Sequence, residues 1–213
     1  RQDTTILLVE HDMDAVFRHL ASPNTRPQLN KLVIAPFMLQ QTMRAHLESC
    51  KKAALKGEYA RVVIKSNAMT DEVLIQALVE AGQAGVQIDL IVRGACMLPA
   101  QVPGVTDNIR VRSVIGRFLE HTRVFYFAWG VHEHVYLSSA DWMSRNMLRR
   151  VELAWPVTDA ALRQQIIDEC LVAYLHDDRD AWSQQPDGRY LPPPHPQTGL
   201  GAQQALMQRY AGG

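Results

Sequence analysis

A histidine and an arginine two residues apart stand at the start of an apolar stretch, within the segment Arg117–Arg123. Residues at positions i and i+2 of a strand point to the same face, so His121 and Arg123 are predicted to lie side by side. An imidazole nitrogen can attack phosphorus or protonate a leaving oxygen, and guanidinium groups neutralise phosphate oxygens with forked hydrogen bonds. The pair favours phosphoryl chemistry. The alternative is a surface histidine at the start of a strand.

Other cationic and polar side chains are expected near strand ends. Lys65 and Asn67 share one face of a predicted strand that ends near them, and Arg93 closes the next strand. Asp141 follows a later strand. In open α/β sheets, ligands bind just outside the carboxyl ends of the strands. These side chains are therefore predicted to face a common binding site. Two further arginines, Arg110 and Arg112, share one face of another predicted strand.

The remaining histidines and the cysteines show no metal-ligand pattern. His132 and His134 follow Trp129-Gly130 between two strands and are predicted to be exposed in a hairpin turn. The three cysteines are too few and too scattered for a disulfide framework or a zinc site. No metal site is predicted in the chain.

The predicted elements indicate a mixed sheet. The first strands and helices alternate as in a parallel βαβ unit, whereas short strands with few helices follow Arg93. The fold class is α/β or α+β, with a mixed central β-sheet flanked by helices. Strands are predicted at 32–36, 61–65, 88–93, 109–115, 123–127, 135–139 and 151–157, and helices at 37–56, 71–84 and 160–175.

Both ends of the chain are predicted to lie outside the main domain. Residues 5–9 are predicted as a strand and 12–20 as helical turns, before a helix-breaking cluster at 22–27. Residues 1–27 are therefore interpreted as the tail end of a preceding domain and a linker, and 28–182 as the domain itself. The segment 183–213 is rich in Gln, Pro and Gly and is predicted to be extended or partly disordered, with a helix at 201–210 as an option.

Composition is ordinary for a globular chain, but its charges are segregated. The 213 residues are 47% hydrophobic and carry no net charge, which excludes disorder over the whole length. No apolar run approaches the roughly 18 residues of a membrane span, and the polar N-terminus predicts no signal peptide. A cytoplasmic protein is therefore expected, and the absence of an initial Met indicates a processed form or a piece of a longer protein. Residues 93–150 hold eight arginines against four acids, a pattern suited to an anionic ligand or to solvated faces.

Three long blocks resemble polyphosphate kinase type 1 in its C-terminal portion. They are Ile88–Gly94, Asp107–His121 and Tyr136–Asn146, and the resemblance extends over about residues 4–190. That family combines an N-terminal helical domain, a head domain and two domains that resemble the halves of phospholipase D. The chain looks like the second phospholipase-D-like half, preceded by the last residues of the first.

The resemblance implies a reaction and several site residues. The family reversibly transfers the ATP γ-phosphate to inorganic polyphosphate with Mg²⁺, through a phosphohistidine of the first half, for which no His-x-Lys match occurs here. His121 matches the family's second-half histidine, which implies a catalytic, phosphate-binding role, and Arg93 matches its nucleotide-phosphate-binding arginine. The other matching positions are assigned to ATP or phosphate binding from charge and geometry alone: Lys65, Asn67, Arg110, Arg112, Arg117 and Arg123.

The sequence also departs from the family pattern. The loop at Cys96–Gln101 lacks an arginine that many members carry, Ser144 stands where proline is common, and Leu148 stands where an acid is common. No Mg²⁺ ligands are identifiable. The implied partners are ATP or ADP, polyphosphate, the preceding domains of the same polypeptide and further copies in a homo-oligomer, with peripheral membrane association as an option and no nucleic acid.

Two other functions stay open. A phosphodiesterase of the phospholipase D type predicts a lysine two residues after the histidine, where this chain has Arg123. A non-catalytic module that binds polyphosphate or nucleotide by charge predicts binding that depends steeply on salt.

Overall fold

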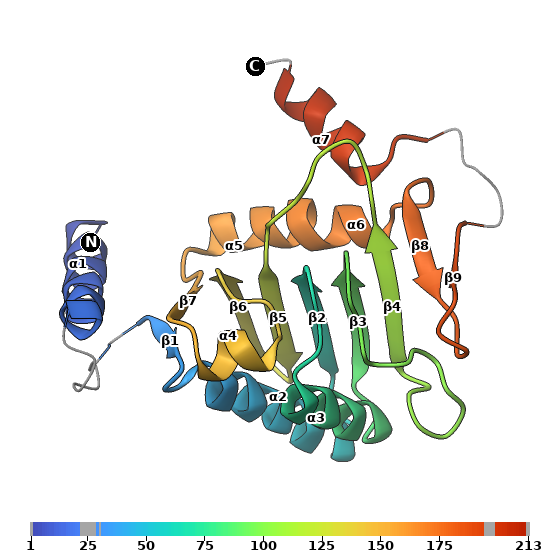
Figure 1. Cartoon of the computed structure of the whole chain (residues 1–213), viewed down its shortest axis with the longest axis horizontal. Helices are drawn as coiled ribbons and strands as arrows, with labels where there is room; N and C mark the ends of the chain where they lie inside the picture. Colours follow the sequence, from blue (N-terminus) through green and yellow to red (C-terminus); the bar gives the residue numbers. More distant parts are fainter. Residues whose placement is uncertain (1, 22–28, 30, 194–198, 212–213) are drawn as a thin grey trace.

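The computed structural model describes residues 2–21, 29, 31–193 and 199–211, with backbone alone for 2–11. Its centre is a nine-stranded sheet of order β1-β7-β6-β5-β2-β3-β4-β8-β9 (Figure 1). Strands β2, β3 and β4 are parallel to one another, and all other neighbours are antiparallel. The predicted mixed sheet is confirmed. The strands are β1 (Val33–Ala35), β2 (Ala60–Ser66), β3 (Gln87–Val92), β4 (Ile109–Val114), β5 (Val124–Trp129), β6 (His132–Ser138), β7 (Glu152–Pro156), β8 (Ala181–Gln184) and β9 (Tyr190–Leu191).

Helices cover both faces of the sheet. Helices α2 (Leu39–Leu55) and α3 (Glu72–Gln83) lie on one face. The other face carries α5 (Ala160–Ile166), which continues through a π-helical stretch at Ile167–Val172 into α6 (Ala173–Leu175). Three more helices are α1 (Gln2–Ala21), α4 (Ser144–Leu148), which follows β6, and α7 (Ala202–Ala211), which lies near the connection between β4 and β5 (Figure 1). Among the described residues, no helix has the length and apolar content needed to cross a membrane.

The sequence of α3 accounts for its position. Asp71 caps the helix by accepting a hydrogen bond from the Leu74 backbone N–H at 3.0 Å. Leu74 and Leu78 are four residues apart, so both face the sheet, and both are fully buried. Gly85 follows the helix with a positive φ of 104°, a conformation that glycine adopts without strain. The helix is thereby fixed between β2 and β3 as the crossover of a βαβ unit.

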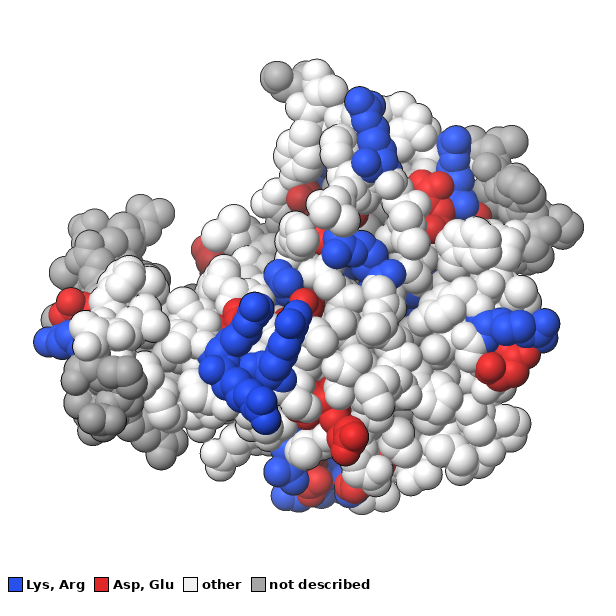
Figure 2. All heavy atoms as spheres, in the orientation of Figure 1, with Lys and Arg blue, Asp and Glu red and all other residues white. Residues whose placement is uncertain are grey.

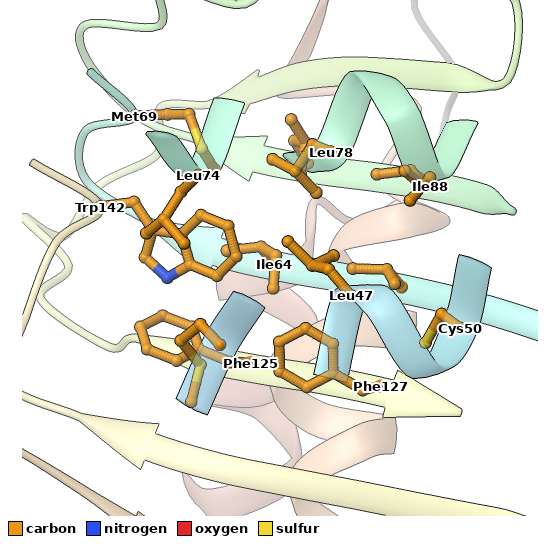
Figure 3. Close-up of a cluster of buried hydrophobic side chains, with 14 of the residues drawn as sticks. Leu47, Cys50, Ile64, Met69, Leu74, Leu78, Ile88, Phe125, Phe127 and Trp142 are labelled. Atoms are coloured by element: carbon orange, nitrogen blue, oxygen red, sulfur yellow. The ribbon is translucent and has the colours of Figure 1, made fainter. Parts of the chain in front are cut away.

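The sheet has a hydrophobic cluster on each face. The larger cluster lies beneath α2 and α3, and Figure 3 shows Leu47, Ile64 and Phe127 within it. The smaller cluster lies beneath α5, the π-helical stretch and α6, and includes Leu171 and Tyr174. Because β2 alternates between the two faces, Ile64 enters the first cluster while Lys65 points to the opposite face.

Two local predictions were wrong. Residues 5–9 belong to α1 instead of a strand, because a short apolar run fits either element. His132 and His134 lie within β6, since the hairpin turn is formed by Gly130 and Val131. In the described parts of the predicted tail, 183–193 and 199–211, Ser183 and Gln184 belong to β8, which pairs with β4, and β9 and α7 follow. The predicted helix at 201–210 corresponds to α7, whereas the predicted boundary at 22–27 lies outside the described residues.

Candidate functional site

Most of the predicted site residues lie along one edge of the sheet. Strands β2, β3 and β4 are parallel, so their carboxyl ends share an edge. The pairing of Lys65 with Val124 brings the start of β5 to this edge, and the pairing of Val124 with Leu137 adds the end of β6. Asn67 and Arg93 therefore lie at the place predicted from the strand ends, and the start of β5 brings His121 to the same edge. This edge is called the site edge below.

A buried ion pair forms the centre of the site edge. The Lys65 ammonium lies 2.5 Å from a carboxylate oxygen of Glu120 and 3.2 Å from the centroid of the Tyr174 ring. The Tyr174 hydroxyl donates to the other Glu120 oxygen at 2.5 Å. Burial lowers the pKa of Lys65, although Glu120 opposes this. Desolvation raises the pKa of Glu120, but Lys65 and the hydrogen bonds outweigh it, so the net direction is downward.

Helix α7 fastens the segment between β4 and β5 to this centre. The Gln203 side chain accepts a hydrogen bond from the Phe118 backbone N–H at 2.8 Å and donates to the Phe118 carbonyl at 2.9 Å. Its amide also donates to Glu120 at 2.6 Å. A Cβ at Gly116 would lie 2.4 Å from the Gln203 side-chain oxygen, so the close approach favours glycine. An open pocket of about 380 Å³ lies beneath α7, lined by Lys65, Glu120, Tyr174 and Gln203 among others.

Asp141 organises the neighbouring part of the site edge. Its carboxylate accepts from the Asn67 backbone N–H at 2.7 Å, from Ser66 Oγ at 3.0 Å and from the Arg123 guanidinium at 2.9 and 3.0 Å. Burial alone raises the pKa of Asp141, but the bonds from Arg123 and Asn67 outweigh it and lower the pKa. Arg123 also donates to the His121 carbonyl at 2.9 Å. A two-pronged ion pair thus fixes the backbone that carries His121.

Arg93 and His121 are placed differently within the site edge. The Arg93 guanidinium is partly exposed and donates to the Glu120 carbonyl, while the Arg93 carbonyl accepts from Ser113 Oγ at 2.9 Å. His121 is exposed, and within the described part of the chain its ring makes no hydrogen bond or ion pair. The imidazole is therefore accessible to a ligand. The backbone beside it is fixed by Arg93 at the Glu120 carbonyl and by Arg123 at the His121 carbonyl.

Two predicted residues lie away from the site edge. Arg110 is exposed near the start of β4, opposite Asp89, at the other end of the strand. Arg112 donates to the carbonyls of Tyr174 and Leu175, so its guanidinium binds the end of α6. A third residue, Arg117, is exposed beside the site edge, with its guanidinium 5.6 Å from the Phe118 ring centroid. The geometry thus brings Lys65, Asn67, Arg93, Arg117, His121 and Arg123 together and leaves Arg110 and Arg112 apart.

Three residues of the site were not predicted as such. Glu120, Tyr174 and Gln203 are far apart in sequence, and their contacts appear only in the folded chain. The one available signal was Glu120, an isolated acid between Arg117 and Arg123 in an arginine-rich region. Lys65, which is buried on β2, needs such an acidic partner.

The site edge does not fit a dedicated Mg²⁺ site. Magnesium requires free carboxylate oxygens and several waters in octahedral geometry. The two acids here, Glu120 and Asp141, are already engaged by Lys65 and Arg123. No group of three or more His, Cys, Asp or Glu side chains suited to a metal occurs among the residues that the structure describes.

Comparison with known proteins decides the family. The sequence profile of "Polyphosphate kinase C-terminal domain 2" matches residues 32–203, which include the whole site edge. The chain belongs to this polyphosphate kinase family. The resemblance noted in the sequence is thereby confirmed.

Individual polyphosphate kinases agree with this assignment. The enzyme of Pseudomonas putida is 45% identical over 200 residues, and that of Paraburkholderia phytofirmans is 43% identical over 199 residues; each match covers 93% of this chain. The crystal structure of polyphosphate kinase from Porphyromonas gingivalis superposes with a TM-score of 0.88 at 32% identity, over 96% of this chain and 31% of that one. The chain spans 27% and 29% of the length of the two curated relatives.

Proposed function

We propose that the chain is the C-terminal catalytic domain of a polyphosphate kinase, which reversibly transfers the γ-phosphate of ATP to inorganic polyphosphate. Family membership supports the reaction class, and the exposed His121 ring is the observation that carries the site, since the carbonyl of its neighbour Glu120 accepts a hydrogen bond from Arg93. The proposal includes Mg²⁺ brought with ATP, a homo-oligomeric whole enzyme and a cytoplasmic location. Membrane-peripheral association is a further option.

The proposed chemistry divides the work between two domains. A histidine of a preceding domain attacks the γ-phosphorus, so that an N–P bond forms while the bond from phosphorus to the β–γ bridging oxygen breaks and ADP leaves. In the second step a terminal oxygen of polyphosphate attacks, the N–P bond breaks and the chain grows by one phosphate. His121 binds the transferring phosphate or donates a proton to the leaving oxygen.

The contacts at the site edge support distinct roles for its cations. Arg93 is assigned to the nucleotide phosphates and Arg117 to phosphate oxygens, because both are accessible to solvent. Lys65 is only 6% exposed and is bonded to Glu120, so its role is to hold the loop and to add positive potential. Arg123 acts similarly through Asp141, with Asn67 beside it.

The test of this division is phosphorylation of the chain by ATP labelled at the γ-position. We expect no acid-labile, alkali-stable label on the chain alone, because the nucleophile belongs to another domain. Label that appears on the chain and disappears in His121→Ala would contradict the proposed division, since His121 would then be the nucleophile.

Replacement of His121 tests the site itself. In the intact enzyme, His121→Ala is expected to lower the rate of polyphosphate synthesis by about 10²-fold or more, because proton transfer and phosphate binding at the reacting centre are lost. Stability is expected to change by less than about 0.5 kcal/mol, since the ring is exposed. His176→Ala, another exposed histidine, is the matched control. A near-normal rate for His121→Ala would remove the residue from the mechanism.

The arginine-rich middle of the chain favours a second candidate, a polyphosphate-binding module without catalysis. Polyphosphate affinity that comes from charge alone is expected to fall steeply with salt concentration and to be the same in His121→Ala as in the unmodified chain. The two candidates are separated by measuring polyphosphate binding and synthesis on the same variant. Loss of synthesis with binding retained supports the catalytic domain.

A further inference from the structure

A group of three arginines lies outside the site described so far. Arg145 belongs to α4, and Arg149 and Arg150 follow this short helix directly; all three are exposed. Figure 2 shows a dense group of Lys and Arg side chains over the position of α4 on this face of the molecule. Arg145, Arg149 and Arg150 are called the arginine patch below.

The backbone holds the three arginines close together. The N–H groups of Arg149 and Arg150 both donate to the Arg145 carbonyl, at 3.1 and 2.9 Å. This double contact ends the helix and turns the chain back over its own last turn. Like charges at such short range repel one another, so the arrangement raises the energy of the free protein and favours an anion that bridges the guanidinium groups.

The positive charge of the patch is not balanced locally. Arg150 is 4.0 Å from Glu152, but the Glu152 carboxylate already accepts from Asn146 Nδ2 and Ser139 Oγ, each at 2.6 Å. Within the described part of the chain, neither Arg145 nor Arg149 forms an ion pair with an acid. The patch therefore presents a concentrated positive field to solvent.

The arginine patch lies at the same sheet edge as His121 and Arg93. Helix α4 connects the end of β6 to the start of β7, and both of these strand ends belong to the site edge. The strand order places three strand intervals between β6 and β3, which is about 14 Å at the usual spacing of neighbouring strands. His121 and Arg123, at the start of β5, lie between the two positions. The acids along this path, Glu120 and Asp141, are neutralised by their own partners.

We propose that the arginine patch is a second anion-binding subsite, which holds distal phosphates of an inorganic polyphosphate chain whose end lies at His121 and Arg93. This inference rests on the proposed function and adds a length requirement to it. A tripolyphosphate bound at Arg93 is shorter than the separation between Arg93 and the patch, whereas a long polyphosphate contacts both places. The planar, permanently charged guanidinium groups suit the repeated phosphate oxygens of such a polymer.

Binding of long polyphosphate and of tripolyphosphate, each titrated over a series of salt concentrations, tests the inference. The variant is Arg145→Gln/Arg149→Gln/Arg150→Gln in the full chain. We expect its Kd for long polyphosphate to rise about tenfold or more at low salt, and the slope of log Kd against log salt to fall by about 2, as for the loss of three phosphate contacts. The Kd for tripolyphosphate is expected to stay unchanged.

A control variant separates local contacts from net charge. Arg44→Gln/Lys52→Gln/Lys56→Gln removes three exposed cations from α2 and the residue after it, two of them at the opposite end of β2. It is expected to bind long polyphosphate almost as tightly as the unmodified chain. Thermal unfolding of both variants confirms that they are folded.

The outcomes distinguish the inference from the function on which it rests. Equal losses in both triple variants, or an unchanged Kd in the patch variant, would overturn the subsite. If the patch variant binds polyphosphate normally but fails to associate with the rest of a polyphosphate kinase polypeptide, the patch is a protein interface and the inference is wrong. If the unmodified chain binds neither long nor short phosphate, the proposed function fails as well.

Discussion

His46 lies in a cluster of rings on the face of the sheet opposite Lys65. Its ring is 5.0 Å from that of Phe127 and 4.8 Å from that of His134, and Nε2 is 2.9 Å from the Tyr136 hydroxyl. Burial and, to a lesser extent, the neighbouring His134 lower the pKa of His46 to about 4. The His46 ring is therefore neutral at physiological pH.

This depressed pKa predicts a loss of stability in mild acid. The unfolded chain binds a proton at His46 near pH 6.5, whereas the folded chain does so only near pH 4. Stability from this residue is thus complete above pH 6.5 and declines as the pH falls toward 4, by about 2 kcal/mol once partial exposure is allowed for. Urea unfolding of the chain at a series of pH values measures it. His46→Gln is expected to flatten the decline in this window, and an equally steep decline in that variant would contradict the assignment.

The individual site residues were predictable where strand ends located them. Arg93 and Asn67 follow strands of a parallel unit, so their meeting at one edge was predicted from topology, whereas the place of His121 depends on the pairing of β5 with β2. Arg112 was assigned to phosphate, yet it binds helix carbonyls, because an arginine-rich pattern does not distinguish a ligand from a helix end. Tyr174 is separated from Glu120 by 54 residues, and no local pattern predicts their contact.

At the scale of elements, α7 acts as a brace for the loop that carries His121. Gln203→Ala removes three hydrogen bonds and leaves the Phe118 amide without its partner. We expect a loss of about 1–3 kcal/mol in stability and faster hydrogen exchange at residues 116–121, with the sheet still protected. Gln208→Ala, on the exposed side of the same helix, is the matched control. Unchanged exchange in the 116–121 segment of Gln203→Ala would show that α7 does not hold the loop.

Elements with a clear period were predictable, and those defined by tertiary contacts were not. Leu74 and Leu78 repeat at helical spacing, and β3 is a short, mostly apolar run interrupted by Asp89, so both elements were predicted within a residue or two. By contrast, β8 is a short strand of mixed composition whose identity depends on pairing with β4. The π-helical stretch at Ile167–Val172 also has no signature in the apolar spacing that predicted one regular helix.

At the scale of the whole molecule, stability depends on the cluster beneath α2 and α3. Leu78 is fully buried there, so Leu78→Ala leaves a cavity and is expected to cost about 2–5 kcal/mol. Leu55→Ala is the control, since that side chain is 68% exposed, and it is expected to cost less than about 0.5 kcal/mol. Denaturant unfolding measures both. Similar costs for the two variants would mean that this cluster does not dominate the stability of the fold.

The fold class of the whole molecule was predictable, but the strand order was not. A parallel unit followed by short strands predicts a mixed sheet. The position of β5 beside β2, and of β4 between β3 and β8, depends on packing between segments that are distant in the sequence. At the sheet edge that carries His121, the ends of the parallel strands β2 and β3 were predictable. The position of β5 beside β2 was not.

The brace formed by Gln203 has a consequence for biosynthesis. A ribosome makes this chain from its N-terminus, so every strand of the sheet is synthesised before Gln203. The side chain that binds Phe118 and Glu120 is therefore synthesised more than eighty residues after the loop that carries His121. Lys65, Tyr174 and Arg93 can bind Glu120 before α7 is made. Nascent chains that stop short of α7 lack the three hydrogen bonds that Gln203 forms with Phe118 and Glu120.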